Sequence, residues 1–399
     1  MRTSVRVFYY VLSAALIVAT AEIGSLAAMM ILRDVGPARF LFYEPPAFDP
    51  GEYAAYMGRR DPVLGWPGPG DRGGPRYDDS GSRHIPSFPR PGGECASLYG
   101  DSFTYSADVN HEDAWSNVLS RLLDCRVANF GVSGYGTDQA YLRFEINRSD
   151  SAPVTILGFY PWDVLRNLTR YQYLIDGTTP QSFKPRFTIE NGKAVLIPIP
   201  QIDEGDLQAF GKAPGRFLDH ETFLPDGRFG PRRIRFPYSV TLARAVLDER
   251  VVNVLRRRPS WENFLLADHD SGGCKITTAI MEKFVELCRR RDKRCFVVLF
   301  PTPSSYRHYK NTGESVLQNL IDSLKDAGID YLHLTPGLSR YLGERSYCEI
   351  LVDPEGCSGH HNPEGDRAVA ELIREYMMSK SWSPGAAAAD GSSPRAVGE

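Results

Sequence analysis

Polar and glycine residues that could carry out acyl transfer follow the apolar runs of this sequence. Ser102 follows the first run, within the stretch LYGDSFTYS, and Gly134 lies in a glycine-rich turn after the second. Asp163 follows the third run, and His360 precedes the last predicted helix. A serine nucleophile, a histidine base and free backbone N–H groups are what acyl transfer from an ester requires. Gly-Asp-Ser is also a common turn sequence. The catalytic interpretation therefore requires that the fold bring these segments to one edge of a sheet.

The elements between these segments alternate between strands and helices. Apolar, β-branched or aromatic runs predict strands at 96–99, 126–132, 154–160, 295–300 and 330–334. Helical periodicity predicts helices at 112–123, 138–147, 275–291, 315–327 and 363–379. This alternation indicates an α/β fold of three α/β/α layers with a parallel sheet. Because sites in such sheets lie at the carboxyl ends of the strands, the four segments are expected to converge.

The predicted domain, 95–380, contains one insertion and lies between two segments that we expect to be non-globular. The insertion, at about 169–260 after the third strand, begins with the hairpin RFTIENGKAVLIPIP and continues into a helix at 238–257. Asn191-Gly192 is the type I′ turn signal of that hairpin. Residues 34–94 are rich in proline and glycine and are expected to run as extended chain over the surface, while 381–399 form a tail that we expect to be disordered.

The N-terminus carries an apolar segment, Phe8–Ile31, long enough to span a bilayer. Arg2 and Arg6 precede it, so by the positive-inside rule residues 1–33 form a single-pass anchor in the inner (cytoplasmic) membrane, with the remaining chain facing the periplasm or exterior. A cleaved signal ending at Ala19-Thr20-Ala21 is the competing interpretation, and a buried core helix is a third. The net charge of −3 and the lack of a long basic stretch argue against a nucleic-acid partner.

The seven cysteines support export. Cys95 and Cys125 begin neighbouring predicted strands and are expected to form a disulfide; Cys348 and Cys357 are a second candidate pair. The third candidate pair, Cys288 and Cys295, would leave Cys274 unpaired, and buried unpaired thiols are the alternative for all of them. No zinc-type spacing of Cys or His is present, so neither a metal nor another cofactor is expected.

Three segments in order resemble the SGNH (GDSL-type) hydrolase family: GDSFT, NFGVSGYGT and His360-His361-Asn362. A third family block, usually Gly-x-Asn-Asp, is matched only approximately by GFYPWD. The resemblance covers about 95–168 and 270–380, and the N-terminal segment with DPVLGW is similar to membrane-tethered exported bacterial members. It implies a flavodoxin-like fold, Ser102 as nucleophile, His360 as base, and the N–H groups of Ser102 and Gly134 as oxyanion donors.

The sequence departs from the family pattern at two positions. The family's triad aspartate lies three residues before the histidine, where this chain has Cys357. Either Asp353 reaches His360, or a backbone carbonyl orients the imidazole in a Ser–His dyad, which we slightly favour. The family's oxyanion asparagine has no clear counterpart, because Trp162-Asp163 occupies its place, and Asn167 is the substitute we expect. Asp163 and His361 remain possible pocket residues.

These residues predict a serine esterase, and the resemblance implies that it acts on O-acyl groups of an extracytoplasmic glycan. An O-acyltransferase with the same Ser–His site, in which a sugar hydroxyl replaces water, shares the first half-reaction. A non-catalytic polysaccharide-assembly protein is the alternative from another class. The expected partners are therefore an acylated carbohydrate or other ester, and the membrane through the N-terminal helix.

Overall fold

A five-stranded parallel sheet forms the centre of the computed structural model, which describes residues 2–34, 40–65, 77–177 and 179–382. The strand order is β2-β1-β3-β6-β7. The strands are β1 (Glu94–Tyr99), β2 (Arg126–Asn129), β3 (Val154–Phe159), β6 (Arg294–Leu299) and β7 (Tyr331–His333). Leu98 of β1 lies opposite Asn129 of β2 on one side and Ile156 of β3 on the other, which places the ends of these three strands level. The predicted parallel sheet is confirmed.

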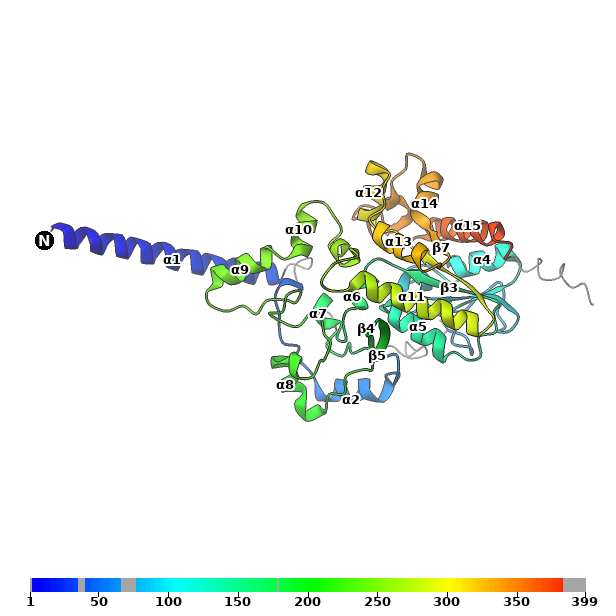
Figure 1. Cartoon of the computed structure of the whole chain (residues 1–399), viewed down its shortest axis with the longest axis horizontal. Coiled ribbons are helices and arrows are strands. Elements are labelled where there is room, and N and C mark those ends of the chain that lie inside the picture. The colour runs from blue at the N-terminus through cyan, green and yellow to red at the C-terminus, as the bar shows by residue number, and fades with distance from the viewer. Residues whose placement is uncertain (1, 35–39, 66–76, 178, 383–399) are drawn as a thin grey trace, which may run out of the picture.

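Helices cover both faces of the sheet, as the α/β/α prediction requires (Figure 1). On one face lie α4 (Trp115–Leu123), α14 (Leu334–Leu342) and α15 (Pro363–Ser379). On the other face lie α5 (Thr137–Ile146), α11 (Gly273–Arg290) and α13 (Gln318–Asp326). Successive strand residues alternate between the two cores: Ile156 packs in the first and Leu157 in the second.

The remaining elements connect these layers. They are α2 (Pro50–Arg59), α3 (Ser102–Tyr105), α6 (Asp163–Arg166), α7 (Tyr173–Asp176), α8 (Leu207–Lys212), α12 (Pro303–Thr312), β8 (Leu351–Asp353) and β9 (Ser358–His361). The insertion contains the predicted hairpin of β4 (Arg186–Glu190) and β5 (Lys193–Ile197), with Asn191 and Gly192 at φ 50° and 74° in its turn.

The helix predicted at 238–257 is divided into α9 (Tyr238–Val246) and α10 (Glu249–Leu255). Asp248 causes the division, because its carboxylate accepts a hydrogen bond from the backbone N–H of Arg250 and begins a new helix there.

The proline- and glycine-rich segment differs from the predicted surface chain. It contains α2, which begins at Pro50 after the capping side chain of Asp49. Tyr53 on this helix is buried, and its hydroxyl donates a hydrogen bond to the carbonyl of Ile202 in the insertion. The segment therefore contributes to the core, which its proline and glycine content did not indicate. The tail after residue 382 and the stretch 66–76 lie outside the described residues.

The helix α1 (Arg2–Asp34) projects away from the domain (Figure 1). Its segment Val5–Asp34 is long and apolar enough to cross a membrane. Side chains from Val5 to Ala21 are exposed, and contact with the domain begins at Glu22.

Two of the three expected disulfides are present. Cys95 and Cys125 are bonded with their Cα atoms 6.0 Å apart, and Cys348 and Cys357 with theirs 4.6 Å apart. The third candidate pair, Cys288 and Cys295, consists of free thiols, as does the buried Cys274. Burial raises the pKa of the Cys288 thiol, and its hydrogen bond with the neighbouring Cys295 raises it further.

Candidate active site

Ser102 is the first residue of the short helix α3, directly after the carboxyl end of β1. The preceding Asp101 forms the cap of this helix, since its Oδ1 accepts hydrogen bonds from the N–H groups of Phe103 (2.9 Å) and Thr104 (3.4 Å). Ser102 is buried to 7% exposure. The Gly-Asp-Ser turn therefore presents the serine at the carboxyl end of β1, and the Asp101 carboxylate shapes the turn.

His360 lies on β9, in the small antiparallel hairpin of β8 and β9. The Cys348–Cys357 disulfide ties this hairpin to the segment before it. The imidazole lies against the ring of Phe103, with ring centroids 4.8 Å apart. Because Phe103 is the residue after Ser102, the fold brings the two segments, more than 250 positions apart in the chain, to the same edge of the sheet.

The carboxylate that binds His360 belongs to Asp108, in the loop between α3 and α4. His360 Nδ1 and Asp108 Oδ2 are 2.6 Å apart. Partial burial alone would raise the pKa of Asp108, but the hydrogen bond and charge of His360 outweigh it and lower the pKa. An ionised carboxylate on Nδ1 fixes the proton there and leaves the Nε2 lone pair free.

Gly359 permits this contact. Its φ is +82°, and a Cβ built there would lie 2.4 Å from Val352 Cγ2 and 3.7 Å from Asp108 Oδ2. A side chain at this position would therefore be strained and would push β9 away from the Asp108 loop.

The structure does not place Asp353 beside His360, and it puts the carboxylate of Asp108, not a backbone carbonyl, at Nδ1. Asp353 lies in the β8–β9 turn, where its carboxylate accepts hydrogen bonds from Gly356 N (2.9 Å) and Ser358 Oγ (2.7 Å). These bonds lower the pKa of Asp353. The residue shapes the hairpin that carries His360, and Asp108 supplies the carboxylate. Sequence reasoning missed Asp108 because no local signal distinguishes it from the other acids of a loop.

A cavity of about 300 Å³ opens beside the Asp108–His360 pair. Its wall includes Tyr77, Tyr105 and, from the glycine-rich turn after β2, Ser133. The next residue, Gly134, has φ +86°, a left-handed conformation that glycine adopts without strain. The turn predicted to supply an oxyanion donor thus lies at the wall of this cavity.

Asn167 does not serve as the predicted side-chain oxyanion donor. It is fully buried, its Nδ2 donates to Thr277 Oγ1 (3.0 Å), and its Oδ1 accepts from the N–H of Asp138 (3.2 Å). The amide therefore joins the beginning of α5 to α11, and its donor group already has a partner inside the protein.

Asp163 is not a pocket residue, because it is fully buried. Its carboxylate lies 2.8 Å from Arg166 Nη1, and the same nitrogen is 3.5 Å from Asp101 Oδ2. Burial, and next the charge of Asp101, raise the pKa of Asp163 well above its usual value. The opposite charges of the two aspartates outweigh burial at Arg166 and raise its pKa. The contacts of Arg166 with Asp163 and Asp101 brace the Ser102 turn against the segment after β3.

His361 is likewise buried, at 2% exposure, and does not line the cavity. Its Nε2 lies 2.8 Å from the hydroxyl of Tyr347, and its Nδ1 lies 3.7 Å from Asp366 Oδ1. Burial, and then the charge of His360, lower the pKa of His361 to about 3, so it is a neutral core residue. Burial raises the pKa of Asp366 to about 7.

Within the described ranges, no group of three or more His, Cys, Asp or Glu side chains is arranged to hold a metal ion.

No family model and no curated protein matches this sequence. Among solved structures, the chain is similar to a lipolytic protein of the G-D-S-L family from Desulfitobacterium hafniense DCB-2, at 12% identity over 70% of this chain and 97% of that one, with a TM-score of 0.33. It is similar to an acetyl-xylooligosaccharide esterase from Geobacillus Stearmophilus, at 12% identity over 71% and 93% of the two chains, with a TM-score of 0.36. It is also similar to the psychrotrophic esterase EstA from Pseudoalteromonas sp., at 8% identity over 71% and 97%, with a TM-score of 0.33. The chemistry proposed below rests on the chain's own residues.

Proposed function

We propose that this protein is a serine hydrolase of ester bonds, with Ser102 as nucleophile, His360 as general base and Asp108 as the residue that orients the base. The observation that carries the proposal is the 2.6 Å contact between His360 Nδ1 and Asp108 Oδ2, beside the helix that Ser102 begins. A carboxylate at Nδ1 holds the proton there, so that Nε2 can accept a proton as a general base must.

The proposed reaction follows from this geometry. His360 Nε2 takes the proton of Ser102 Oγ as the oxygen attacks the ester carbonyl. Asp108 holds the imidazole in the required tautomer and stabilises the imidazolium that forms. The proton then passes to the leaving alcohol, and water, activated by the same histidine, releases the acid from the acyl-enzyme.

The oxyanion donors in this proposal are the backbone N–H groups of Ser102 and Gly134. The Ser102 N–H is at the first position of α3, where a helix has no internal acceptor for it. Gly134 lies in the turn whose preceding residue lines the cavity. With the Asn167 amide engaged elsewhere, the stabilisation depends on the backbone, and loss of one such donor typically costs about 3 kcal/mol.

For the substrate, we propose an O-acyl group on a glycan outside the cytoplasmic membrane. The resemblance to exported, membrane-tethered SGNH hydrolases supports this class, and α1 would anchor the chain with Arg2 and Arg6 on the cytoplasmic side. Transfer of the acyl group to a sugar hydroxyl would use the same first half-reaction, and an acceptor sugar added to the assay separates the two outcomes.

The test uses the full chain in detergent, with 4-nitrophenyl acetate and a fluorophosphonate probe. Wild type should release nitrophenol and become labelled at Ser102, whereas Ser102→Ala should do neither while keeping its fold, because the change of one hydroxyl alters stability little. Asp353→Asn is the matched control, since it removes a carboxylate from the same hairpin without touching His360. If Ser102→Ala is labelled by the probe as strongly as wild type, Ser102 is not the nucleophile.

A further inference from the structure

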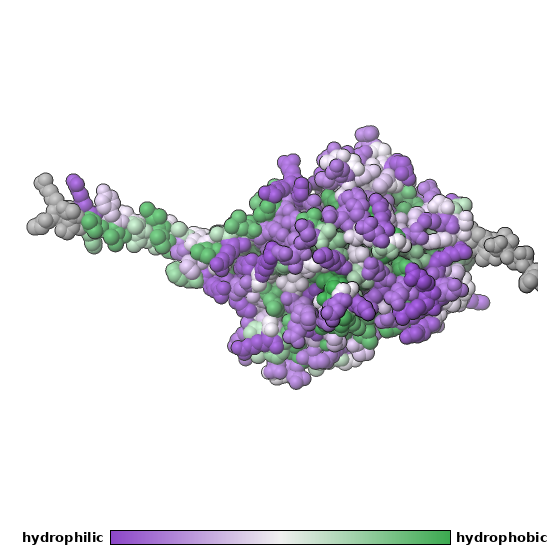
Figure 2. Space-filling model, viewed as in Figure 1, coloured by the Kyte–Doolittle hydropathy of each residue, from purple (hydrophilic) through white to green (hydrophobic). Residues whose placement is uncertain are grey.

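A cluster of exposed apolar side chains lies next to α1, on the insertion segment Phe236–Leu255. Among the described residues outside α1, the most exposed large apolar side chains are Leu255 (76%), Leu247 (74%) and Phe236 (69%). Val240 (45%) and Val254 (58%) belong to the same segment. Figure 2 shows hydrophobic residues along α1 and at the end of the domain from which it emerges.

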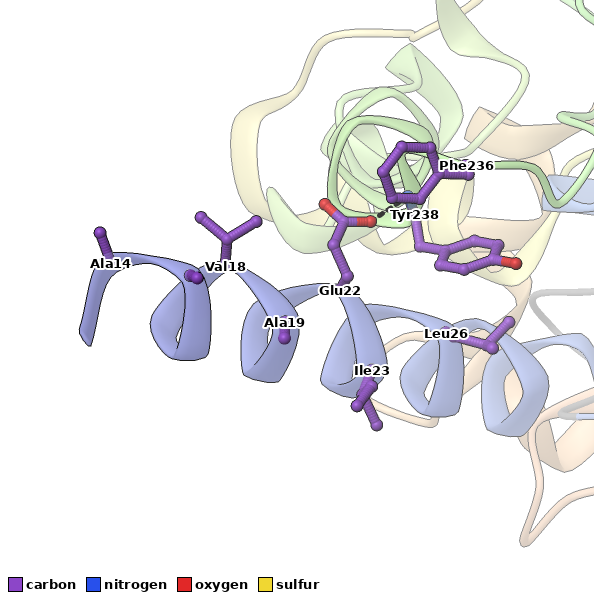
Figure 3. A pocket seen from close by; sticks show the side chains of 9 residues that line it. Ala14, Val18, Ala19, Glu22, Ile23, Leu26, Phe236 and Tyr238 are labelled. Atoms are coloured by element: carbon purple, nitrogen blue, oxygen red, sulfur yellow. Dashed lines mark hydrogen bonds between the residues drawn. The ribbon is translucent and has the colours of Figure 1, made fainter. Parts of the chain in front are cut away.

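The length of α1 places the start of this segment, Phe236 and Tyr238, at a membrane surface. The exposed stretch Val5–Ala21 extends about 25 Å at 1.5 Å per residue. The hydrocarbon core of a bilayer is about 30 Å thick. If α1 spans the bilayer, its first contacts with the domain, at Glu22, fall near the outer boundary of the hydrocarbon core. Phe236 and Tyr238 lie at the same level of α1 (Figure 3).

Glu22 fixes the insertion to α1 at this level. Its carboxylate accepts a hydrogen bond from the backbone N–H of Tyr238 (Figure 3). It also accepts hydrogen bonds from the backbone N–H and the hydroxyl of Ser239. These N–H groups begin α9, whose own cap residue, Pro237, contributes no side-chain hydrogen bond. A negative charge at the start of a helix satisfies its free N–H groups and its dipole. An acidic residue in an otherwise apolar helix thus has a defined partner, and α9 is held along α1.

A groove of about 550 Å³ adjoins this contact, between α1 and the segment at 236–238. Its lining is almost entirely apolar and includes Val18, Ile23 and Leu26 with Phe236. A groove of this composition at the depth of the acyl chains is suited to hydrocarbon, because water in it would find few hydrogen-bond partners.

The charge of the segment also matches a lipid surface. Residues 236–258 contain five arginines and two acidic residues. The acids Asp248 and Glu249 are paired with Arg250 and His269, whereas Arg244, Arg256 and Arg257 are exposed. Exposed arginines beside exposed leucines are the pattern of an element that lies in the interface of a membrane containing anionic phospholipid.

We propose that α9 and α10 form a membrane-contact element: Phe236, Leu247 and Leu255 enter the outer boundary of the bilayer that α1 spans, and the neighbouring arginines bind anionic phospholipid headgroups. The proposal rests on the anchoring role given to α1 above and adds a second contact. A single helix would leave the domain free to swing above the bilayer, and a second contact sets the height and orientation of the Ser102 site over the membrane surface.

The test uses the full chain in nanodiscs of phosphatidylethanolamine and phosphatidylglycerol, with one spin label per variant. Cysteines introduced as Leu247→Cys and Leu255→Cys carry the label, in a background where the partly buried Cys295 is serine. Collision with apolar oxygen should exceed collision with the water-soluble nickel reagent at both positions. Leu16→Cys in α1 is the reference for lipid, and Met378→Cys, an exposed position (52%) on α15, is the reference for water.

Each outcome decides between the anchor and the added contact. Nickel-dominated collision at 247 and 255, with oxygen dominating at Leu16→Cys, would overturn the membrane-contact element and leave the anchor in place. Nickel-dominated collision at Leu16→Cys as well would overturn both. Low collision with both reagents at 247 and 255 would mean that protein, such as a second copy, covers them, which also contradicts the proposal.

The lipid composition tests the role of the arginines. Replacing phosphatidylglycerol with phosphatidylcholine should reduce oxygen collision at both positions; no reduction would contradict that role. Ester hydrolysis by the same variants reports separately on the catalytic proposal.

Discussion

Replacing Asp108 with asparagine should reduce kcat/KM for ester hydrolysis by about 10²- to 10³-fold. A hydrogen bond to a charged group contributes about 1.5–3 kcal/mol, which corresponds to about 10- to 100-fold in rate. Asparagine also offers an N–H to Nδ1, which favours the wrong tautomer, and in a buried triad this exchange costs about 10⁴-fold. The Asp108 side chain is 42% exposed, so water can replace part of what the carboxylate provides, and the expected loss lies between these limits.

Asp108→Ala should reduce kcat/KM less than Asp108→Asn. Alanine leaves Nδ1 open to a water molecule that can accept its proton, so the reactive tautomer stays populated. The assay is initial-rate hydrolysis of 4-nitrophenyl acetate, with thermal unfolding of each variant measured alongside. Because the Asp108–His360 pair is partly exposed, its loss should change the free energy of unfolding by less than about 1 kcal/mol.

Asp353→Asn provides the control for both variants. It removes a hairpin carboxylate that bonds Gly356 and Ser358, and it should leave kcat/KM within about threefold of wild type. Full activity of Asp108→Asn in a preparation that Ser102→Ala inactivates would refute the assignment of Asp108. A loss of activity in Asp353→Asn alone would instead identify Asp353, in the β8–β9 hairpin, as the triad acid.

Three further predictions concern the structure around the site. Gly359→Ala should lower kcat while the protein stays folded at the assay temperature, because the added Cβ would meet Val352 at 2.4 Å and displace β9 with His360. An unchanged kcat would contradict this. Converting Cys95 and Cys125 to alanine should reduce the free energy of unfolding in urea by about 3–4 kcal/mol, as expected for a closed loop of this length; an unchanged denaturation midpoint would mean the bond does not form. Buried His361, with a pKa of about 3, binds a proton between pH 3 and 6.5 only when unfolded, so it makes stability rise with pH. Asp366, with a pKa of about 7, binds one between pH 4 and 7 when folded and has the opposite effect. Asp366→Asn should therefore make the protein lose stability as pH falls from 6.5 to 4, measured by chemical denaturation at each pH, and a flat profile would exclude this pairing.

Local patterns in the sequence were sufficient for the sheet and for the segments at its edge. Apolar runs at 154–160 and 295–300 became β3 and β6 because a central parallel strand is buried on both faces and needs no other signal. The Cys95–Cys125 disulfide followed from two neighbouring strands that begin level with each other. Ser102 and His360 were identifiable because a nucleophile after a strand and a histidine before a helix have short, local signatures.

The partners of these residues were decided by the tertiary structure. Asp108 reaches His360 across a separation of 252 positions, and Gly359 allows the approach only in the folded chain. Asp353 was nearer in sequence but is held by its own hairpin, and the Asn167 amide is held by Thr277 on α11. The contact of Glu22 with the start of α9 joins the chain's first helix to its insertion in the same way. Hydrogen-bond partners depend on where a side chain points once the backbone has packed. Sequence alone therefore predicted the strands and pointed to Ser102 and His360, and only packing determined which carboxylate contacts His360 and which helix Glu22 binds.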